Sequence, residues 1–347
     1  MRIYKALLPA SWLYGIGVGA RNLFFDCGLL KSRSFDIPVI CVGNLAVGGT
    51  GKTPHVEHIT RLLKDQHRLA VLSRGYKRRT KGFVLAGNDS TALDIGDEPM
   101  QIHSKYDDIT VAVDENRCEG IERLMALGTE VVVLDDAFQH RYVKPSLSIL
   151  LIEHSRLHGD QLLPAGRLRE PLSGIRRADI VVVTKCPTPM KEEDYEKAAK
   201  SFHLSPRQHL FFSRMEYMGL EPVFRNGKDV PHVINQDTNV LIVSGIANPS
   251  PMEDEIRKHT THIQHLAYGD HHAFSDNDIA DINTAFTQLP TPKLVVTTEK
   301  DAARLRTTQG LSREVMEHTC QLPIKVKILK EEGGTFDHLI INHVSTQ

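Results

Sequence analysis

The chain has 347 residues, of which 41% are hydrophobic and 24% are charged, and its formal net charge at pH 7 is −1. This length and composition predict a globular protein with two domains. The near-neutral charge excludes the broad basic surface of a nucleic-acid-binding protein, so no nucleic-acid partner is expected. The five cysteines are scattered without a CxxC pair, which is typical of reduced thiols in the cytosol.

The first thirty residues contain an uncharged run between Lys5 and Arg21. The run is too short to span a bilayer comfortably, and Pro9 and three glycines lie within it. It resembles a signal peptide in outline, but its aromatic residues and flanking cations favour an uncleaved segment in the membrane interface. Packing of this helix on its own domain is the alternative. Residues 1–33 are therefore predicted to be an apolar, membrane-associated helix.

A strand is predicted at 37–42, and a glycine-rich loop and a helical pattern follow it. This order is the context of a phosphate-binding loop, in which backbone N–H groups from Gly48 to Lys52 face the phosphates. Lys52 would contact the β- and γ-phosphates, and Thr53 would bind Mg²⁺. The predicted nucleotide-binding residues of the loop are Val47, Gly48, Gly49, Thr50, Gly51, Lys52 and Thr53.

One position departs from the strict phosphate-loop motif. Glycine is required five residues before Gly51, and this chain has Ala46. We expect Gly43 or Asn44 to supply any positive φ angle that the longer loop needs. The alternative is a glycine-rich turn that binds nothing.

Short apolar runs alternate with helical patterns along the chain. They predict strands that are buried on both faces of a parallel sheet, at 38–42, 68–72, 109–113, 131–134, 147–152 and 179–184. A second series begins after Pro206, at 209–217, 239–243, 262–267, 293–297 and 324–328. The fold class is therefore α/β: a P-loop NTPase-like parallel-sheet domain at 34–208 and a smaller α/β domain with linker strands at 209–347. A cleft between them is expected to hold the ligands.

The hydrophobic run at 130–136 ends in two carboxylates, Asp135 and Asp136. P-loop enzymes hold Mg²⁺ with an acid at such a strand end, opposite the threonine of the loop. Asp135, Asp136 and Thr53 are therefore predicted metal ligands, with one acid touching the ion and the other acting through water. The alternative is a strand-end turn in which Asp135 caps the next element.

Other polar residues are candidates for chemistry as well. Asp97 precedes Pro99, so a helix cap is the simpler explanation for it on the sequence alone. At 270–272 an acid stands beside two histidines, which fits a polarised base; a zinc site that uses His262, His265, His271 and His272 is the alternative. Basic stretches at 73–79, 114–118 and 163–170 are candidates to contact an anionic substrate or are simply solvated loops.

Taken together, motifs along nearly the whole chain resemble the tetraacyldisaccharide 4′-kinase family. They are Ser11-Trp-Leu-Tyr14, Gly43-Asn-Leu45, Gly48-Gly-Thr-Gly-Lys-Thr-Pro54, Leu72-Ser-Arg-Gly-Tyr76, Gly96-Asp-Glu-Pro99, Asp135-Asp-Ala-Phe-Gln-His140, Gly166-Arg-Leu-Arg-Glu170, Val183-Thr-Lys185, Asp270-His-His272 and Thr298-Glu-Lys-Asp301. One departure is Ala137, where the family usually has glycine, and a methyl group there is tolerable if φ is negative.

The resemblance implies a lipid kinase of lipid A biosynthesis. Such an enzyme transfers the γ-phosphate of ATP, with Mg²⁺, to the 4′-hydroxyl of a tetraacylated glucosamine disaccharide 1-phosphate. It works at the cytoplasmic face of the bacterial inner membrane, so the N-terminal segment becomes a peripheral, monotopic anchor. No protein partner is implied.

The resemblance also implies roles for single residues. Asp97 would accept the proton of the 4′-hydroxyl, His271 would orient or polarise Asp97, and Lys52 would position the phosphates. Gln139 is assigned to the nucleotide. The residues assigned to the substrate are Arg74, Arg78, Arg117, Arg169 and Glu170.

The rival hypothesis is a P-loop GTPase or ATPase switch at the membrane. Val183-Thr-Lys185 is similar to the start of a guanine-recognition motif, but Cys186 and Pro187 follow where an aspartate is required two residues after the lysine. A membrane-binding module that uses ATP only structurally and a kinase for a cytosolic small molecule are further alternatives. Nucleotide preference and phosphoryl transfer separate these possibilities.

Overall fold

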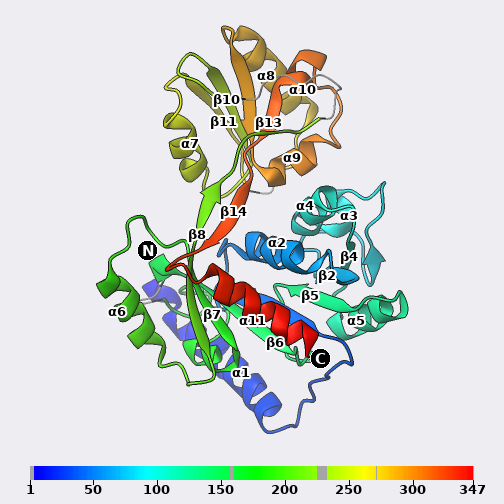
Figure 1. Ribbon diagram of the computed structural model, residues 1–347, viewed down its shortest axis with the longest axis vertical. Helices are drawn as coiled ribbons and strands as arrows, with labels where there is room; N and C mark the ends of the chain where they lie inside the picture. The colour runs from blue at the N-terminus through cyan, green and yellow to red at the C-terminus, as the bar shows by residue number, and fades with distance from the viewer. Residues whose placement is uncertain (1–3, 157–159, 225–232, 271, 347) are drawn as a thin grey trace.

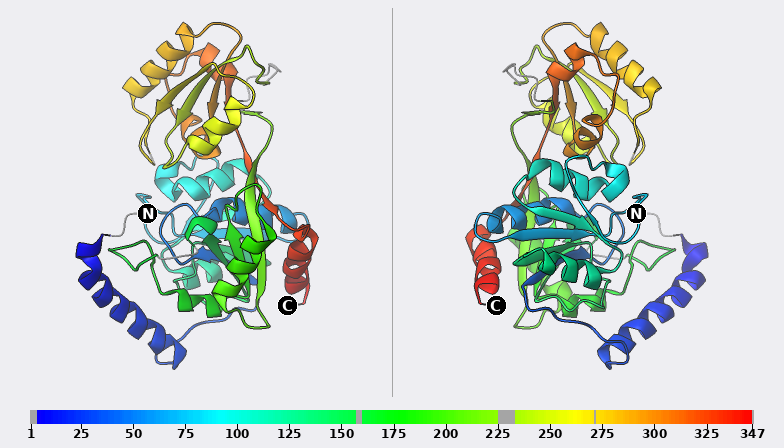
Figure 2. Two further views of the ribbon diagram at one scale, coloured as in Figure 1. Left: turned by 90° about the vertical axis from the view of Figure 1, so that its left-hand side faces the viewer. Right: turned by 90° about the vertical axis from the view of Figure 1, so that its right-hand side faces the viewer.

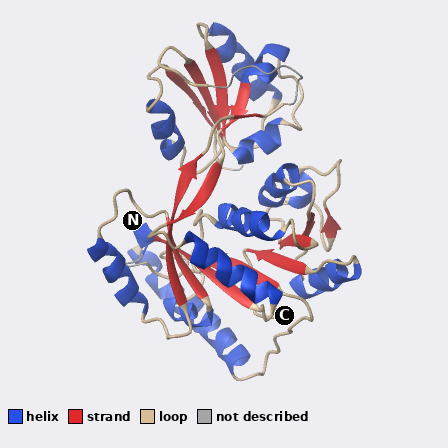
Figure 3. Cartoon of the chain, viewed as in Figure 1, coloured by secondary structure: helices blue, strands red, loops and turns tan. Residues whose placement is uncertain are grey.

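The protein consists of two α/β lobes that two long strands connect, as Figure 1 shows for the computed structural model. The structure describes residues 4–156, 160–224, 233–270 and 272–346. Coloured by secondary structure, each lobe has strands at its centre and helices outside (Figure 3). The predicted α/β class with a parallel sheet is confirmed.

The larger lobe contains a nine-stranded sheet. Its strands are β1 (Val39–Asn44), β2 (Leu69–Ser73), β3 (Val84–Leu85), β4 (Thr110–Val113), β5 (Val131–Asp135), β6 (Leu147–Glu153), β7 (Ile180–Thr184), β8 (His209–Tyr217) and β14 (Ile324–Ile328). They lie in the order β14-β8-β7-β6-β1-β5-β2-β4-β3. The strands from β8 to β4 run parallel, and β14 and β3 pair antiparallel at the two edges.

Helices cover both faces of this sheet. The lobe contains α1 (Leu8–Asp26), α2 (Lys52–Leu63), α3 (Ala92–Ile95), α4 (Asp97–Lys105), α5 (Arg117–Ala126), α6 (Glu192–Phe202) and α11 (Gly333–Ser345), with short 3₁₀ turns η1 (Lys5–Leu7), η2 (His154–Arg156) and η3 (Leu172–Arg177). Alternate side chains of β1 show the layering: Ile40 packs in the core with α2, α4 and α11, whereas Cys41 packs with α5 and η3. This two-sided burial explains why the strands read as continuous apolar runs.

The smaller lobe repeats this design at a smaller size. Its strands are β9 (Glu221–Pro222), β10 (Asn239–Ser244), β11 (Ile263–Ala267), β12 (Lys293–Thr297) and β13 (Thr319–Gln321), in the order β11-β10-β12-β13-β9. Its helices are α7 (Ser250–Arg257), α8 (Asp276–Gln288), α9 (Glu299–Leu305) and α10 (Arg313–His318). Phe286 of α8 packs against one face of the sheet and Met252 of α7 against the other.

The segment at 324–328 lies elsewhere than the sequence analysis placed it. It was assigned to the smaller lobe, but as β14 it pairs antiparallel with β8, with Ile328 opposite Ser213. The reason is burial, because Val326 and Ile328 pack into the core of the larger lobe together with Phe336 of α11. The chain therefore leaves the larger lobe along β8 and returns along β14 (Figure 1).

The topology determines where a ligand can bind. β1 lies at the centre of the large sheet, with β5 on one side and β6 on the other. Ligands of open α/β sheets bind beyond the carboxyl ends of the strands at such a switch point. The glycine-rich loop follows β1 directly, and the acidic pair lies at the end of β5, whose last residue is Asp135.

Candidate active site

The glycine-rich loop between β1 and α2 is fixed by the neighbouring strand ends. Thr50 O accepts a hydrogen bond from Thr184 Oγ1, the last residue of β7, at 2.8 Å. Thr50 Oγ1 accepts one from Asn44 Nδ2, the last residue of β1, also at 2.8 Å. Because all three residues are buried, this anchor excludes water. The loop therefore presents the N-terminus of α2 in one defined orientation.

Gly48 and Gly51 supply the positive φ angles of this loop, at 107° and 87°. The expectation that Gly43 or Asn44 would do so is wrong, because β1 continues through both residues. Gly43 is required for space instead, since a Cβ atom there would lie 2.6 Å from the Cβ atom of Phe138. The loop thus accommodates Ala46 by turning at later glycines.

His55 of α2 lies buried behind the loop. Its Nδ1 atom is 2.7 Å from Gly51 O, and its Nε2 atom is 3.2 Å from Ser213 Oγ on β8. A carbonyl oxygen only accepts, so Nδ1 carries the proton and Nε2 accepts from the serine hydroxyl. Burial lowers the pKa of His55 to about 4, because a charged ring is poorly solvated there. The neutral ring therefore connects the loop to β8 through two hydrogen bonds.

The acidic pair at the end of β5 lies beside the loop. Asp135 is opposite Val42 of β1, and Lys52 Nζ is 3.7 Å from Asp136 Oδ2. Asp135 is buried, and its Oδ1 atom has no hydrogen-bond partner in the described part of the chain. Burial and, second, the charge of Asp136 raise the pKa of Asp135 to about 7. The structure therefore brings Lys52, Asp135 and Asp136 together.

The turn after Asp135 contains the departure from the family motif. Asp136 has a φ of 53°, whereas Ala137 is not among the residues with positive φ. The methyl group of Ala137 is therefore accommodated without backbone strain, as expected for a negative φ.

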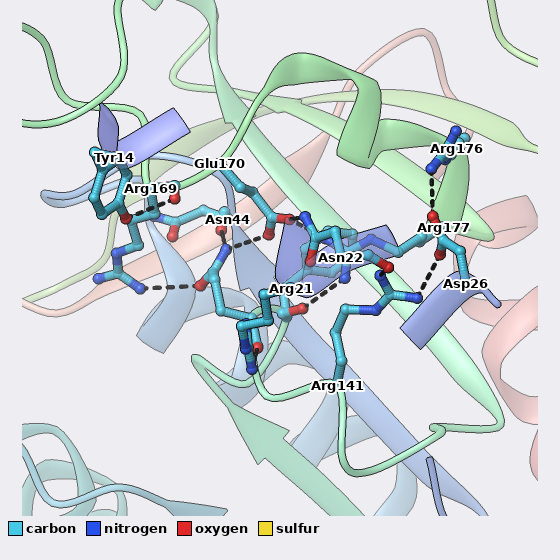
Figure 4. Close-up of polar contacts among 12 residues, drawn as sticks. Tyr14, Arg21, Asn22, Asp26, Asn44, Arg141, Arg169, Glu170, Arg176 and Arg177 are labelled. Carbon is cyan, nitrogen blue, oxygen red and sulfur yellow. Dashed lines mark hydrogen bonds and ion pairs between the residues drawn. The ribbon is translucent and has the colours of Figure 1, made fainter. Parts of the chain in front are cut away.

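A hydrogen-bond network extends from Asp136, and its members Arg169, Glu170 and Arg177 are labelled in Figure 4. Arg169 Nη1 donates to both carboxylate oxygens of Asp136, at 2.8 and 3.0 Å. Gln139 Nε2 donates to Glu170 Oε1 at 2.8 Å, and Arg177 Nη2 donates to Glu170 Oε2 at 2.5 Å. Because Arg169 also donates to Gln139 Oε1 at 3.3 Å, the predicted residues Gln139, Arg169 and Glu170 form one group with Asp136.

The polar side of α1 docks on this network. Figure 4 shows its residues Tyr14 and Asn22 beside Arg169 and Glu170. The contacts are Tyr14 OH to Arg169 O at 2.8 Å, Arg21 Nη2 to Gln139 O at 3.0 Å, and Asn22 Nδ2 to Glu170 Oε2 at 3.3 Å. α1 is therefore part of the wall around the acidic pair.

The other side of α1 is apolar and exposed. Trp12 and Leu13 are 70% and 73% exposed, and Ile16, Leu23 and Phe24 are exposed as well. Figure 2 shows α1 at the outer edge of the larger lobe. In the described ranges of the chain, no helix combines the length and the hydrophobicity that crossing a membrane requires.

Asp97 opens α4, and an arginine of the smaller lobe binds its carboxylate. Arg304 donates from Nε to Asp97 Oδ1 at 2.9 Å and from Nη2 to Asp97 Oδ2 at 2.6 Å. The next residue, Glu98, lies close enough to Asp135 for its charge to raise the pKa of that carboxyl. The first turn of α4 therefore lies near both the acidic pair and the smaller lobe.

The predicted basic residues do not all join this group. Arg117 is buried, and burial, followed by the charge of Arg74, lowers its pKa, while Asp135 has the opposite effect. The side chain of Arg78 is only 2% exposed, and it donates to Glu115 Oε1 at 2.7 Å. Arg117 and Arg74 are therefore close to the acidic pair or to each other, whereas contact of Arg78 with a substrate stays a prediction.

The histidines of the smaller lobe give no metal site in the part of the chain that the structure describes. His271 lies outside the described residues, so its predicted contact with Asp97 stays a prediction. His272 stacks on Tyr268 with ring centroids 4.8 Å apart, and its Nε2 atom is 2.8 Å from Asp278 Oδ2. No group of three or more His, Cys, Asp or Glu side chains is arranged to hold a metal ion among the described residues.

Sequence reasoning missed four polar residues of this region: Asn22, His55, Arg177 and Arg304. Asn22 had a usable signal, since a polar residue beside Arg21 in an apolar segment marks the side that docks. The sequence held no such signal for Arg304, because this residue lies 207 positions from the aspartate that it binds. Only the folded chain brings the two together.

The chain is similar to known proteins along nearly its whole length. The sequence matches the sequence model of the family described as tetraacyldisaccharide-1-P 4'-kinase over residues 3–344. A tetraacyldisaccharide 4'-kinase from Parabacteroides distasonis is 52% identical, over 100% of this chain and 96% of the relative. Another from Bacteroides thetaiotaomicron is 50% identical, over 99% of this chain and 94% of the relative.

A solved structure is similar along its whole length. It is the crystal structure of the "apo" form of LpxK from Aquifex aeolicus in complex with ATP. The TM-score is 0.76 at 32% sequence identity, and the match covers 98% of each chain. With the family model and the relatives at about half identity, this likeness identifies the chain as a member of the tetraacyldisaccharide-1-P 4'-kinase family.

Proposed function

We propose that this protein transfers the γ-phosphate of ATP to the 4′-hydroxyl of a tetraacylated glucosamine disaccharide 1-phosphate, a step of lipid A biosynthesis. The observation that carries the proposal is the assembly of Lys52, Asp135 and Asp136 at the carboxyl end of the sheet in a member of this kinase family. Phosphoryl transfer depends on positioning the phosphates and on neutralising their charge, and these residues are suited to both tasks.

ATP binds along the glycine-rich loop in this proposal. Val47 N–H already donates to Arg167 O at 2.8 Å, so the donors that meet the phosphates begin at Gly48. Lys52 carries positive charge to the β- and γ-phosphates, and Gln139 contacts the nucleotide. The related crystal structure is in complex with ATP, which supports ATP as the nucleotide.

The acidic pair fits a magnesium ion. Mg²⁺ takes oxygen ligands, and Asp135, Asp136 and the Thr53 hydroxyl provide them. We assign the direct contact to Asp135, because its buried Oδ1 atom has no partner in the described part of the chain, while Arg169 already binds both oxygens of Asp136. Asp136 then acts through water or through Lys52. When bound there, Mg²⁺ neutralises charge on the β- and γ-phosphates.

Asp97 accepts the proton of the 4′-hydroxyl, and His271 orients or polarises it. The closeness of Glu98 to Asp135 supports this, because it puts the first turn of α4 near the acidic pair. The substrate-binding residues of the proposal are Arg74, Arg78, Arg117, Arg169 and Glu170. Two lobes that close over the ligands would complete such a site.

The protein acts at the cytoplasmic face of the inner membrane in this proposal, as a peripheral protein that α1 anchors. The exposed Trp12, Leu13 and Ile16 support this location, since apolar and aromatic side chains favour the lipid interface. The polar side of α1 meets Arg169, Gln139 and Glu170. A lipid drawn to α1 would therefore arrive beside the acidic pair.

Transfer of label tests the proposal. The purified protein is incubated in mild detergent with γ-labelled ATP, Mg²⁺ and the tetraacyldisaccharide 1-phosphate, and label on the lipid is measured. We expect label with the wild type and with Lys64→Ala, which removes a lysine at the other end of α2, and almost none with Lys52→Ala. No transfer despite tight ATP binding would contradict the kinase proposal, and tighter binding of GTP would favour the switch.

A further inference from the structure

We propose that Arg304 is a positioning residue of the transfer reaction, through which the smaller lobe orients the carboxylate of Asp97. The inference rests on the proposed function, in which Asp97 accepts the proton of the acceptor hydroxyl. Arg304 is on α9 of the smaller lobe, whereas Asp97 is on α4 of the larger lobe.

The contact between the two side chains has the geometry that fixes a carboxylate best. Nε and Nη2 of the planar guanidinium donate to separate oxygens of Asp97, at 2.9 and 2.6 Å. Both side chains are shielded, with exposures of 8% for Arg304 and 14% for Asp97. Two parallel charge-assisted hydrogen bonds fix the orientation of the carboxylate plane, and they also favour the ionised form of the carboxylate.

Arg304 is itself held rigidly by its own lobe. Its Nη1 atom donates to Asp301 Oδ1 at 2.9 Å, and the Asp301 side chain is fully buried. Asp301 Oδ2 accepts from Gly245 N at 3.0 Å and from Thr298 Oγ1 at 2.7 Å. A Cβ atom at Gly245 would lie 3.1 Å from Asp301 Oδ1, so the backbone there is tightly packed against this pair. The guanidinium is therefore oriented before it meets Asp97.

Further ion pairs join the same two helices. Lys300 Nζ is 2.6 Å from Glu98 Oε1. Lys105, at the end of α4, pairs with Glu299 of α9 and with Glu57 of α2. α4 is thereby fixed to α9 at both of its ends. The position of Arg304 relative to Asp97 therefore depends on how the two lobes are placed relative to each other.

This arrangement leaves Asp97 able to accept a proton. An ionised carboxylate has about four lone-pair sites, and Arg304 occupies one on each oxygen. The guanidinium therefore sets the direction in which the carboxylate presents its other lone pairs toward a substrate hydroxyl. Among the described residues, the charges near Asp97 include those of Glu98 on its own helix, of Lys300 and Asp301 on α9, and of Asp270, whose charge acts on Arg304.

The test compares Arg304→Gln with Lys300→Gln, which removes a cation from the same helix and the same contact between lobes. We expect Arg304→Gln to lower kcat roughly tenfold to hundredfold, with the KM for ATP unchanged, because a misplaced acceptor slows the chemical step. The acid limb of its kcat–pH profile should move to higher pH, since a carboxylate that loses a neighbouring cation holds its proton more tightly. Lys300 binds Glu98 and not Asp97, so Lys300→Gln should leave kcat near the wild-type value and move the acid limb less than Arg304→Gln does.

A double-mutant cycle separates positioning from a purely structural role. If Arg304 acts through Asp97, Arg304→Gln should cost little further activity in an Asp97→Asn background, so the two losses are not additive. Arg304→Lys keeps the charge without the paired geometry and should retain the wild-type acid limb with a reduced kcat. This variant carries the test if Arg304→Gln does not fold.

Three outcomes would overturn the inference. One is a wild-type acid limb in Arg304→Gln, another is additive losses in the cycle, and the third is a raised kcat, which would make Arg304 an inhibitory contact. Failure of the proposed function is distinguishable, because the wild type itself would then phosphorylate no lipid.

Discussion

His55 illustrates at the residue scale how one buried side chain stabilises the candidate site. It joins Gly51 of the glycine-rich loop to Ser213 of β8, and its neutral form makes both hydrogen bonds. Folding lowers its pKa to about 4 from the ordinary 6.5 because the ring is buried. The unfolded chain therefore binds a proton between these values that the folded chain does not, so this site stabilises the fold less as pH falls through that window.

The prediction from His55 concerns the pH dependence of stability. Between pH 7 and pH 5 the wild type should lose about 2 kcal/mol of unfolding free energy through this residue, since one pKa unit is worth about 1.36 kcal/mol. His55→Gln does not titrate, so its stability should fall less over the same interval. Urea unfolding of both proteins at the two pH values measures the difference. Equal slopes would show that His55 does not carry this dependence.

At the scale of elements, α1 combines a docked polar side with an exposed apolar side. The prediction is that Trp12→Ser together with Ile16→Ser weakens binding to anionic phospholipid vesicles roughly tenfold or more, because burying one large apolar side chain is worth about 1.5–3 kcal/mol. Leu127→Ser is the matched control, since Leu127 is 60% exposed but directly follows α5. Vesicle sedimentation measures binding. If the α1 double variant and Leu127→Ser bind vesicles equally well, α1 does not contact the membrane.

Most elements could be predicted from the sequence because both faces of the central strands, such as β1, β2, β5 and β7, are buried, which leaves an unmistakable apolar run. The partner of a strand could not, as β14 shows: its sequence, Ile324-Lys-Val-Lys-Ile328, fits either lobe, and only packing against Phe336 decides. The acidic pair could be predicted because it lies at the end of an apolar strand, β5. Arg304 was not, since its role depends on how the lobes meet.

At the scale of the whole molecule, a cluster of buried charged side chains fixes the two lobes relative to each other. Lys105 of α4 lies between Glu57 of α2 and Glu299 of α9, and both glutamates are buried. Burial and, second, the charge of Glu299 raise the pKa of Glu57. α2 begins with Lys52 and α4 with Asp97, so this lysine links both helices to the smaller lobe.

The prediction from this cluster is a loss of stability on removing the cation. Lys105→Met should lower the unfolding free energy by about 3 kcal/mol, because two buried carboxylates lose their partner. Lys64→Met is the control, since Lys64 has the same side-chain exposure of 22% but pairs with exposed Asp65 and Asp108. Denaturant unfolding compares the two variants. An equal effect of both substitutions would contradict the proposed link.

The central claim is that the chain phosphorylates one hydroxyl of a lipid disaccharide. The most direct measurement gives the wild type ATP, Mg²⁺ and either the tetraacyldisaccharide 1-phosphate or its analogue with hydrogen in place of the 4′-hydroxyl, and determines the products by mass spectrometry. We predict one added phosphate on the natural acceptor and none on the analogue. Phosphate on both lipids, or on neither, would contradict the claim.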